Sequence, residues 1–171
     1  MKKILVIGAG RSSSSMIKYF LDNSQQEDWF VKVGDMDVSI AQEKVNNHPN
    51  GLAFLFNALD PQERAKEIAD SDIVISMLPA RFHMEVVKDC IAYKKDVITP
   101  SYITDQMKEL NEQVLAAGII AMNEMGLDPG IDHMSAMKIL DEIEESGGCV
   151  KGFESFTGGL IAPESDNNPW N

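Results

Sequence analysis

Short apolar runs rich in β-branched residues alternate regularly with longer amphipathic runs along this chain. The runs that predict strands cover residues 3–8, 29–34, 52–56, 72–78, 96–99 and 118–123. The runs with helical spacing lie between them, at residues 11–23, 38–47, 61–69, 82–94 and 104–117. Because strand and helix alternate throughout, the pattern predicts an α/β domain built on a doubly wound parallel sheet.

The strand runs are continuously apolar, which is typical of strands that are covered by helices on both faces. Ligands of such sheets bind beyond the carboxyl ends of the strands. We therefore expect a cleft lined by residues 8–13, 35–37, 78–83, 99–102 and 123–133.

A glycine-rich turn, VIGAGRSS, connects the first strand to the first helix. Gly8, Gly10 and Ser13 have the spacing of a dinucleotide-binding fingerprint. Gly8 permits a tight turn, and the missing side chain of Gly10 lets a pyrophosphate approach the backbone at the helix start. Ser13 replaces the expected third glycine or alanine, and its hydroxyl is free to bind a phosphate or to pack. The alternative to a dinucleotide-binding fingerprint is a plain turn without a ligand. The Arg11 side chain either covers the phosphates or is solvated.

The ends of the second and fourth strands carry further candidate cofactor contacts. Asp35, in VGDMD, stands where a carboxylate accepts hydrogen bonds from the adenosine ribose and repels a 2'-phosphate, which favours NAD over NADP. Asp37 competes for this role, and a solvated loop acid is the alternative for Asp35. In SMLPA, Pro79 ends the strand and leaves the backbone of Leu78 and Ala80 free near the cofactor, although strand termination alone explains the same residues.

Charge and composition exclude several classes of partner. The formal net charge of -12 disfavours nucleic acid and anionic membranes. Cys90 and Cys149 are far apart and lack metal-binding spacing, so we expect two reduced thiols, no disulfide and no metal site. No apolar run approaches the ~20 residues that span a bilayer, and the first strand leaves no room for a signal segment. We therefore expect a soluble, cytoplasmic protein.

The sequence after residue 128 predicts two further elements, a helix and a strand. Asp128 as N-cap, Pro129 in the first turn and a stop at 147–148 predict a further helix. A seventh strand is expected at 151–157, with Phe153 and Phe156 exposed on its edge unless another chain covers them.

Three stretches in the second half of the chain carry a more specific signal. They are TPSYIT (99–104), MNEMGLDPGIDHM (122–134) and GGLIAPESDNNP (158–169). Together they resemble the saccharopine dehydrogenase family, in the branch that forms L-glutamate. The family motifs read S-S-Y-I, G-E/I-G-L-D-P-G-I-D-H and C-G-G-L-P-A-P-E-x-S-x-N-P. The chain departs from the family at Thr157, where Cys is frequent, and at Ala80, where many members have an aromatic residue.

The resemblance implies a Rossmann-like NAD(P)-binding domain at 1–128 and the entry to an α+β substrate and dimerisation domain at 129–171. The implied enzyme transfers hydride from the secondary amine of saccharopine to a nicotinamide cofactor. The products are L-glutamate and 2-aminoadipate 6-semialdehyde, in lysine metabolism. Family members are much longer, so we expect this chain to be inactive alone and the full-length protein to be a homodimer.

Carried over by position, the resemblance also implies site residues. Ser101, Tyr102 and Asp128 match residues that contact the substrate. Asp128 and Tyr102 are the candidates for proton transfer, because the amine must lose a proton before hydride leaves. The competing role for Asp128 is a helix N-cap. The expected cofactor contacts are Gly8, Ala9, Gly10, Arg11, Ser12, Asp35, Met77, Leu78, Pro79, Ala80, Pro100 and Ser101.

Neighbouring residues of the same motif are given structural roles. We expect Asp132 and His133 to serve packing or helix-start electrostatics, and Glu124 to orient the strand end. Two other functions stay open at this stage. One is a dehydrogenase of another carboxylated secondary amine, such as a carboxyspermidine. The other is a non-catalytic module that binds NAD.

Overall fold

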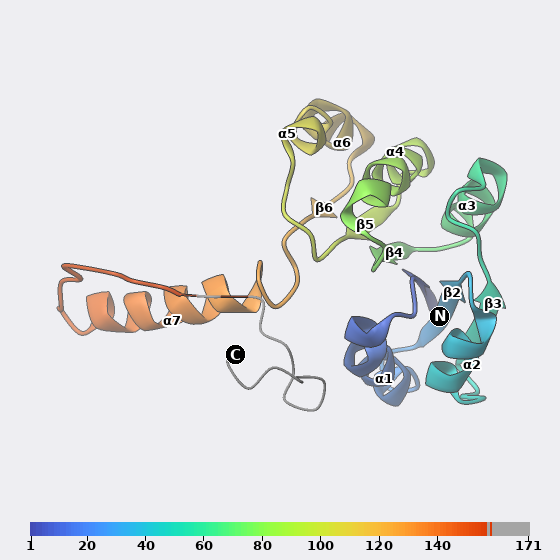
Figure 1. Ribbon diagram of the computed structural model, residues 1–171, viewed down its shortest axis with the longest axis horizontal. Helices are drawn as coiled ribbons and strands as arrows, with labels where there is room; N and C mark the ends of the chain where they lie inside the picture. Colours follow the sequence, from blue (N-terminus) through green and yellow to red (C-terminus); the bar gives the residue numbers. More distant parts are fainter. Residues whose placement is uncertain (157, 159–171) are drawn as a thin grey trace, which may run out of the picture. The chain divides into compact units, whose positions relative to one another are not determined.

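The structure is a computed structural model that describes residues 1–156 and 158. The chain divides into two compact units, residues 1–134 and 135–171, and each is considered by itself (Figure 1). The domain boundary expected at residue 128 stays a prediction.

The first unit is built on a six-stranded sheet, counted over the described residues, in the order β3-β2-β1-β4-β5-β6. All of its strand pairs are parallel, which confirms the doubly wound sheet. The strands are β1 (Lys2–Ile7), β2 (Trp29–Asp35), β3 (Gly51–Leu55), β4 (Ile73–Ser76), β5 (Asp96–Ile98) and β6 (Ala121–Met122). The strand order reverses between β1 and β4, and a crevice for ligands forms at such a reversal.

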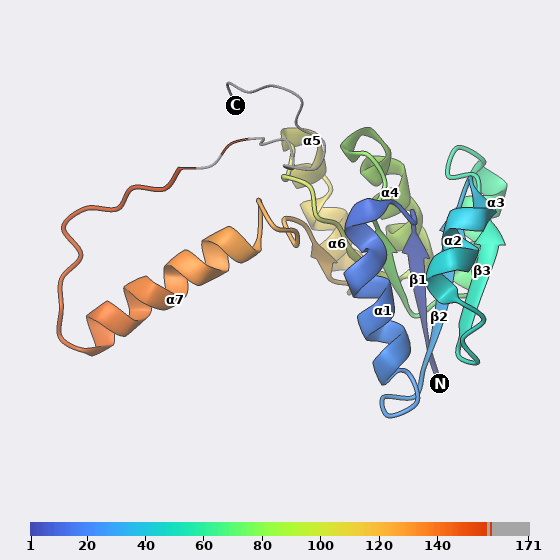
Figure 2. The same ribbon diagram turned by 60° about the horizontal axis from the view of Figure 1, so that its bottom comes forward.

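Helices cover both faces of this sheet. They are α1 (Ser14–Asn23), α2 (Val38–Val45), α3 (Pro61–Ala69), α4 (His83–Tyr93), α5 (Asp105–Lys108) and α6 (Asn111–Ala117). Two 3-10 turns, η1 (Arg11–Ser13) and η2 (Ala80–Phe82), precede α1 and α4. In Figure 1, α1 and α2 lie below the strands, whereas α3, α4 and α6 lie above them, and Figure 2 shows α1 and α2 from the side.

Alternate residues of the central strand fill two separate cores. Ile4 and Val6 of β1 pack with Ile17 of α1 in one buried cluster. Leu5 and Ile7 point to the opposite face and pack with α4 in a second cluster. Because both faces of β1 are covered, every one of these side chains is removed from water, and each contributes about 1.5–3 kcal/mol of hydrophobic stabilisation. This is the physical origin of the continuous apolar runs.

Helix starts were predicted well where a side-chain cap is present. Asp60 accepts hydrogen bonds from the backbone N–H groups of Gln62 and Glu63, with Pro61 in the first turn, and α3 matches its predicted range. The single helix expected at 104–117 is wrong. It is divided at Glu109 and Leu110 into α5 and α6.

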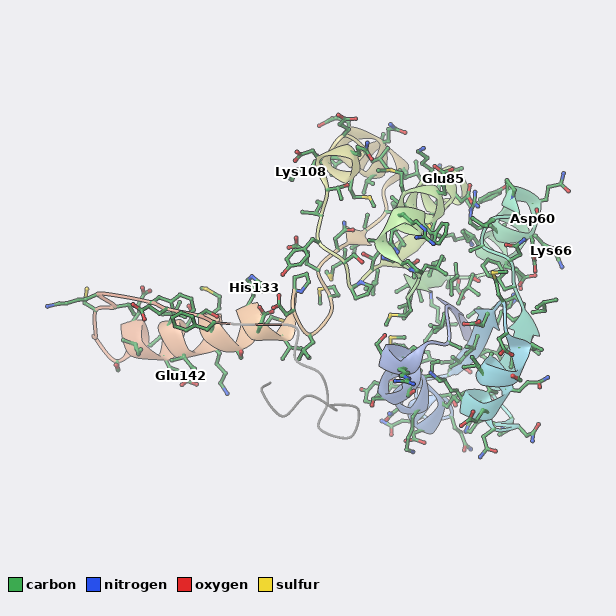
Figure 3. The ribbon with its side chains drawn as sticks, viewed as in Figure 1. Asp60, Lys66, Glu85, Lys108, His133 and Glu142 are labelled. Atoms are coloured by element: carbon green, nitrogen blue, oxygen red, sulfur yellow. The ribbon has the colours of Figure 1, made fainter. Side chains whose placement is uncertain are left out.

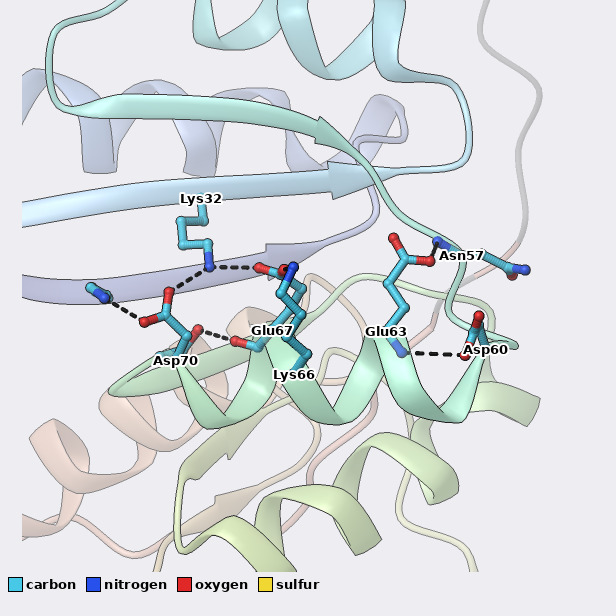
Figure 4. Close-up of polar contacts among 9 residues, drawn as sticks. Lys32, Asn57, Asp60, Glu63, Lys66, Glu67 and Asp70 are labelled. Atoms are coloured by element: carbon cyan, nitrogen blue, oxygen red, sulfur yellow. Dashed lines mark hydrogen bonds and ion pairs between the residues drawn. The ribbon is translucent and has the colours of Figure 1, made fainter.

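A buried lysine ties β2 to α3 (Figure 4). The side chain of Lys32 is 7% exposed, and its Nζ donates to Glu67 Oε2 at 2.6 Å and to Asp70 Oδ2 at 2.9 Å. Burial alone would lower the pKa of Lys32, but the hydrogen bonds and charges of the two carboxylates outweigh it and raise the pKa. The charge is therefore buried as a satisfied ion pair, which also connects sheet and helix.

The helix after residue 128 is present as α7 (Ile131–Glu145), but the predicted cap is wrong. Gly130 has a φ of +145°, a conformation outside the helical region, so the helix begins only after it. The acidic run at 141–145, near the end of α7, is exposed to solvent. No helix in the described part of the chain is long and apolar enough to cross a bilayer.

The strand expected at 151–157 is absent over residues 151–156. These residues have no neighbouring strand to pair with in the described part of the second unit, and an unpaired extended segment gains no ladder of hydrogen bonds. Phe153 and Phe156 are 59% and 89% exposed. Thr157 and the third motif, apart from Gly158, lie outside the described residues.

Candidate functional site

Gly8 forms the tight turn at the end of β1. Its φ is +102°, and a Cβ at this position would lie 3.0 Å from the backbone oxygen of Met77. Its N–H donates to Gly34 O at 2.8 Å, which fixes the turn against β2. Conformation and space therefore both require glycine, as the fingerprint predicts.

Gly10 has the opposite surroundings. A Cβ added to Gly10 would meet no heavy atom within 4 Å, and the residue is exposed. Packing of the chain itself does not require glycine here, so the bare backbone is free for close approach of a ligand. Ser13 is fully buried, and its hydroxyl donates to Gly10 O at 2.8 Å. The Ser13 hydroxyl thus braces the turn from within.

Lys44 was not singled out from the sequence, yet it lies at the same turn. Its Nζ donates from α2 to Gly10 O and, at 3.3 Å, to Ser13 Oγ. Burial lowers the pKa of Lys44, while the charge of Asp35 opposes the shift. The ammonium group brings a positive charge to the turn where phosphates are expected. No spacing in the sequence connects residue 44 with residue 10, so only the fold reveals this contact.

The Asp35 carboxylate accepts two backbone hydrogen bonds, one from the glycine turn and one from its own loop. Its Oδ2 accepts from the backbone N–H of Ala9 at 2.6 Å, and its Oδ1 accepts from the N–H of Asp37 at 2.9 Å. A carboxylate has about four acceptor positions, which leaves room for two further donors. Asp37, the competing candidate, is the N-cap of α2, where its Oδ1 accepts from Ser39 N at 3.0 Å.

A cavity of about 340 Å³ opens between these residues, at the lower end of the range for ligand pockets. It is lined by the ends of the first four strands, through Ile7, Gly8, Gly10, Gly34, Asp35, Met36, Phe56, Ala58, Leu59, Met77, Leu78, Pro79 and Phe82. Six of the expected cofactor residues therefore share one cavity at the point where the strand order reverses. Arg11, Ser12 and Ala80 are exposed and do not line it.

The two candidates for proton transfer contact each other. Tyr102 Oη donates to Asp128 Oδ1 at 2.6 Å, and both side chains are exposed. This hydrogen bond, rather than a helix cap, is the interaction that Asp128 makes. It raises the pKa of Tyr102, because the neighbouring carboxylate disfavours the phenolate. Tyr102 therefore stays protonated near neutral pH and is the hydrogen-bond donor of the pair.

The segments that carry this pair are joined through Glu124. Its N–H donates to Ser101 O at 3.0 Å, and its Oε1 accepts from Ile103 N at 3.0 Å. Glu124 therefore links the segment that follows β6 to the loop that carries Tyr102.

Asp132 and His133 contact each other at the start of α7. Asp132 Oδ1 accepts from Gly130 N and contacts His133 Nδ1, both at 2.8 Å. His133 lies in the first turn of α7 (Figure 3), and the hydrogen bond with Asp132 raises its pKa.

A histidine that the sequence analysis missed lies beneath Ser101. His83 is 2% exposed, and its Nδ1 and Nε2 lie 2.9 Å from Ser76 Oγ and 2.8 Å from Ser101 Oγ. Burial lowers the pKa of His83, so the ring is neutral. Ser76 ends β4 and Ser101 follows β5, and only the pairing of these two strands brings the three residues together.

The cysteines do not contribute to this site. Cys90 is buried, and burial raises the pKa of its thiol to about 12, which makes it unreactive. Cys149 is exposed. Among the described residues, no group of three or more histidine, cysteine or acidic side chains is arranged to hold a metal ion.

Comparison with known proteins shows which family this chain matches. Residues 4–122 match the model of the saccharopine dehydrogenase NADP binding domain, and residues 126–171 match that of the saccharopine dehydrogenase C-terminal domain. The chain belongs to the saccharopine dehydrogenase family. The resemblance of the three motifs is thereby confirmed.

Individual members of the saccharopine dehydrogenase family match almost the whole chain. Saccharopine dehydrogenase (NADP(+), L-glutamate-forming) of Pyricularia oryzae is 50% identical over 98% of this chain and 36% of its own length. The mitochondrial alpha-aminoadipic semialdehyde synthase of Bos taurus is 41% identical over 98% of this chain and 18% of its own length. The apo saccharopine dehydrogenase (L-Glu forming) structure from Saccharomyces cerevisiae superposes with a TM-score of 0.84 at 40% identity, over 99% of this chain and 37% of that one. The chain thus spans little more than a third, or less, of these relatives.

Proposed function

We propose that this chain is the dinucleotide-binding part of an oxidoreductase that acts on saccharopine. The reaction oxidises the secondary amine to an imine, which water then splits into L-glutamate and 2-aminoadipate 6-semialdehyde, in lysine metabolism. The observation that carries the proposal is the cavity at the point where the strand order reverses. In its lining, the conformation of Gly8 requires glycine, the backbone at Gly10 is open to a ligand, and the Asp35 carboxylate is a hydrogen-bond acceptor. The names of the relatives support the choice of substrate.

For the cofactor, we propose NAD. The family model and the fungal relative are named for NADP, and those names favour the phosphorylated form. The Asp35 carboxylate supports NAD, because it lies where the ribose is expected and its charge repels a 2'-phosphate. Bound there, the nicotinamide ring would accept a hydride from the carbon next to the amine. Gly8, Gly10 and Asp35 would hold the dinucleotide.

The chemistry assigned to this chain is proton transfer. Asp128 accepts the proton that the secondary amine loses and releases it to solvent. The restored carboxylate then accepts a proton from the attacking water and returns it to the nitrogen of the departing amine. The Tyr102 hydroxyl, held at 2.6 Å from Asp128, orients the carboxylate and donates a hydrogen bond to the substrate when it rotates away. Ser101, which precedes Tyr102 in sequence, completes the substrate contacts.

Several further statements belong to the same proposal. The remaining cofactor contacts are Ala9, Arg11, Ser12, Met77, Leu78, Pro79, Ala80, Pro100 and Ser101. A domain boundary at residue 128, a homodimer of the longer polypeptide and a cytoplasmic location complete it. The bovine relative is named mitochondrial, so cell fractionation with an antibody against this chain is the appropriate test of location.

The proposed activity is tested on the polypeptide encoded by the complete reading frame that contains this sequence. Saccharopine-dependent reduction of NAD and of NADP is measured, and L-glutamate is quantified as product. We expect turnover with a higher kcat/KM for NAD, and a loss of about a hundredfold or more in Asp128→Asn, the usual size of a general-base contribution. The 171-residue chain alone is expected to bind dinucleotide without turnover. A folded full-length protein that binds dinucleotide but does not oxidise saccharopine would refute the substrate assignment.

A further inference from the structure

The Ser76 hydroxyl determines which ring nitrogen of His83 carries the hydrogen, and His83 in turn contacts Ser101. Ser76 is fully buried, and in the described part of the chain its Oγ has one hydrogen-bond partner, Nδ1 of His83 at 2.9 Å. Ser76 can satisfy its own proton there only by donating it to Nδ1. If Nδ1 carried the hydrogen instead, the Ser76 proton would be buried without an acceptor, which is costly.

The second nitrogen of the ring follows from the first. A neutral imidazole has one N–H and one acceptor nitrogen. With Nδ1 accepting from Ser76, the hydrogen lies on Nε2, which donates to Ser101 Oγ at 2.8 Å. The Ser101 oxygen then acts as acceptor toward the protein, so its own proton is available to a ligand.

The backbone of Ser101 is fixed as well. Its carbonyl oxygen accepts from the N–H of Glu124 at 3.0 Å, and Ile103, two residues on, donates to the Glu124 carboxylate. Because hydrogen bonds hold both the backbone and the hydroxyl oxygen of Ser101, the directions in which its hydroxyl hydrogen can point are restricted. Such pre-organisation reduces the entropy that a bound ligand must remove.

We propose that Ser76 and His83 are positioning residues that lock Ser101 as a hydrogen-bond donor to an acceptor oxygen of the bound ligand. The inference rests on the proposed function, which supplies two ligand oxygens of this kind. One is a carboxylate oxygen of the amino-acid substrate, and the other is the carboxamide oxygen of the nicotinamide. Ser76 and His83 touch neither ligand, and both act through Ser101.

The tautomer can be measured directly on the 171-residue chain, without any ligand. Nitrogen-15 NMR of the imidazole rings distinguishes an Nε2–H ring from an Nδ1–H ring and from imidazolium. The chain has three histidines, so His48→Gln and His133→Gln assign the His83 signals by elimination. We expect the Nε2–H form in the parent chain and a shift toward Nδ1–H in Ser76→Ala. Ser15→Ala, an exposed site on α1, is the matched control and leaves the signals unchanged. An Nδ1–H ring or an imidazolium in the parent chain would overturn the proposal.

The effect on ligands is measured in the full-length polypeptide. His83→Leu removes the N–H that faces Ser101, whereas His83→Gln replaces it with an amide N–H. We expect His83→Leu to weaken one ligand by roughly three- to tenfold, the usual range for one neutral hydrogen bond, and His83→Gln to restore most of it. A change confined to the KM for saccharopine identifies the carboxylate as partner, and a change confined to the dinucleotide Kd identifies the carboxamide.

Failure of this inference and failure of the proposed function are distinguishable. If His83→Leu melts like the parent and both constants are unchanged, the positioning role is wrong although the enzyme assignment stands. If neither dinucleotide binds to the parent protein, the proposed function is wrong, while the NMR result still decides the tautomer. Should His83→Leu not fold, Ser76→Ala provides the same comparison, because loss of the Ser76 donor releases the tautomer.

Discussion

The carboxylate of Asp35 accepts a 2.6 Å hydrogen bond from the backbone N–H of Ala9, in the centre of the glycine turn. The acid at the end of β2 is therefore positioned by the turn that we propose as the phosphate-binding site. This contact orients Asp35 before any ligand arrives, and it joins two cofactor features that are 26 residues apart in the sequence.

The preference for NAD is expected to depend on Asp35. In Asp35→Ser a shorter, neutral hydroxyl replaces the carboxylate, so the charge-assisted acceptor for the ribose is lost, NAD affinity should fall by about tenfold and the ratio of NADP to NAD affinity should rise. Fluorescence titration of the reduced dinucleotides measures both. Asp37→Asn is the control, because it keeps the cap of α2 and lies two residues away. An unchanged ratio in Asp35→Ser would contradict this role.

The two glycines of the turn should respond differently to the same substitution. Gly8→Ala places a Cβ 3.0 Å from Met77 O at a φ of +102°, and should reduce the free energy of unfolding by about 1–3 kcal/mol. Gly10→Ala meets no neighbour within 4 Å, and should leave folding unchanged within about 0.5 kcal/mol. Urea unfolding followed by circular dichroism compares them. Equal losses in both variants would show that the turn geometry is wrong.

Two lysines that pair with Glu67 provide a test of the buried ion pair (Figure 4). Lys32 is 7% exposed, so Lys32→Ala removes the buried cation from Glu67 and leaves that carboxylate, which is 12% exposed, with only the exposed Lys66 as ion-pair partner among the described residues. This loss should destabilise the domain by roughly 3 kcal/mol. Lys66 is 80% exposed, and Lys66→Ala should change stability by less than about 1 kcal/mol. Urea midpoints at neutral pH measure both. Similar effects of the two substitutions would refute the difference that burial predicts.

The sequence predicted the fold well because each element is specified locally. Asp60 and Pro61 mark the start of α3, and the apolar runs identify the strands of a sheet covered on both faces. The division between α5 and α6 was missed because apolar residues such as Leu110 keep their helical spacing across the break. The cap at Asp128 was wrong because Gly130, a turn signal already visible in the sequence, interrupts the helix.

The candidate residues that the sequence analysis named each belong to a short motif that is continuous in sequence. The glycine turn and the loop that carries Asp128 each form one motif. Tyr102 and Asp128 were named from two separate motifs, and their hydrogen bond is known only from the structure. His83 and Lys44 could not be found in this way. Their partners Ser101 and Gly10 are distant along the chain, and only strand pairing and helix packing bring them into contact.

The hydrogen bond between Tyr102 and Asp128 should be visible in a titration. The Asp128 carboxylate raises the pKa of the Tyr102 phenol. Asp128→Asn removes the charge and should therefore lower the Tyr102 pKa toward 10.0. Carbon-13 NMR of labelled tyrosine rings follows the titration. The ring signals of Tyr19 and Tyr93 serve as internal controls and should be the same in both proteins. A Tyr102 pKa that does not move would mean that the pair is not formed in solution.

The central claim is that the turn from Gly8 to Gly10 receives the diphosphate of a nicotinamide dinucleotide. Isothermal calorimetry of NAD and NADP with the folded 171-residue chain tests it most directly, with Gly10→Ala as the matched variant because that substitution is not expected to disturb folding. The account predicts that NAD binds to the parent chain and that the Cβ of Gly10→Ala weakens binding by about tenfold or more. A chain with a cooperative melting transition that binds neither dinucleotide, or that binds equally well with alanine at position 10, would contradict it.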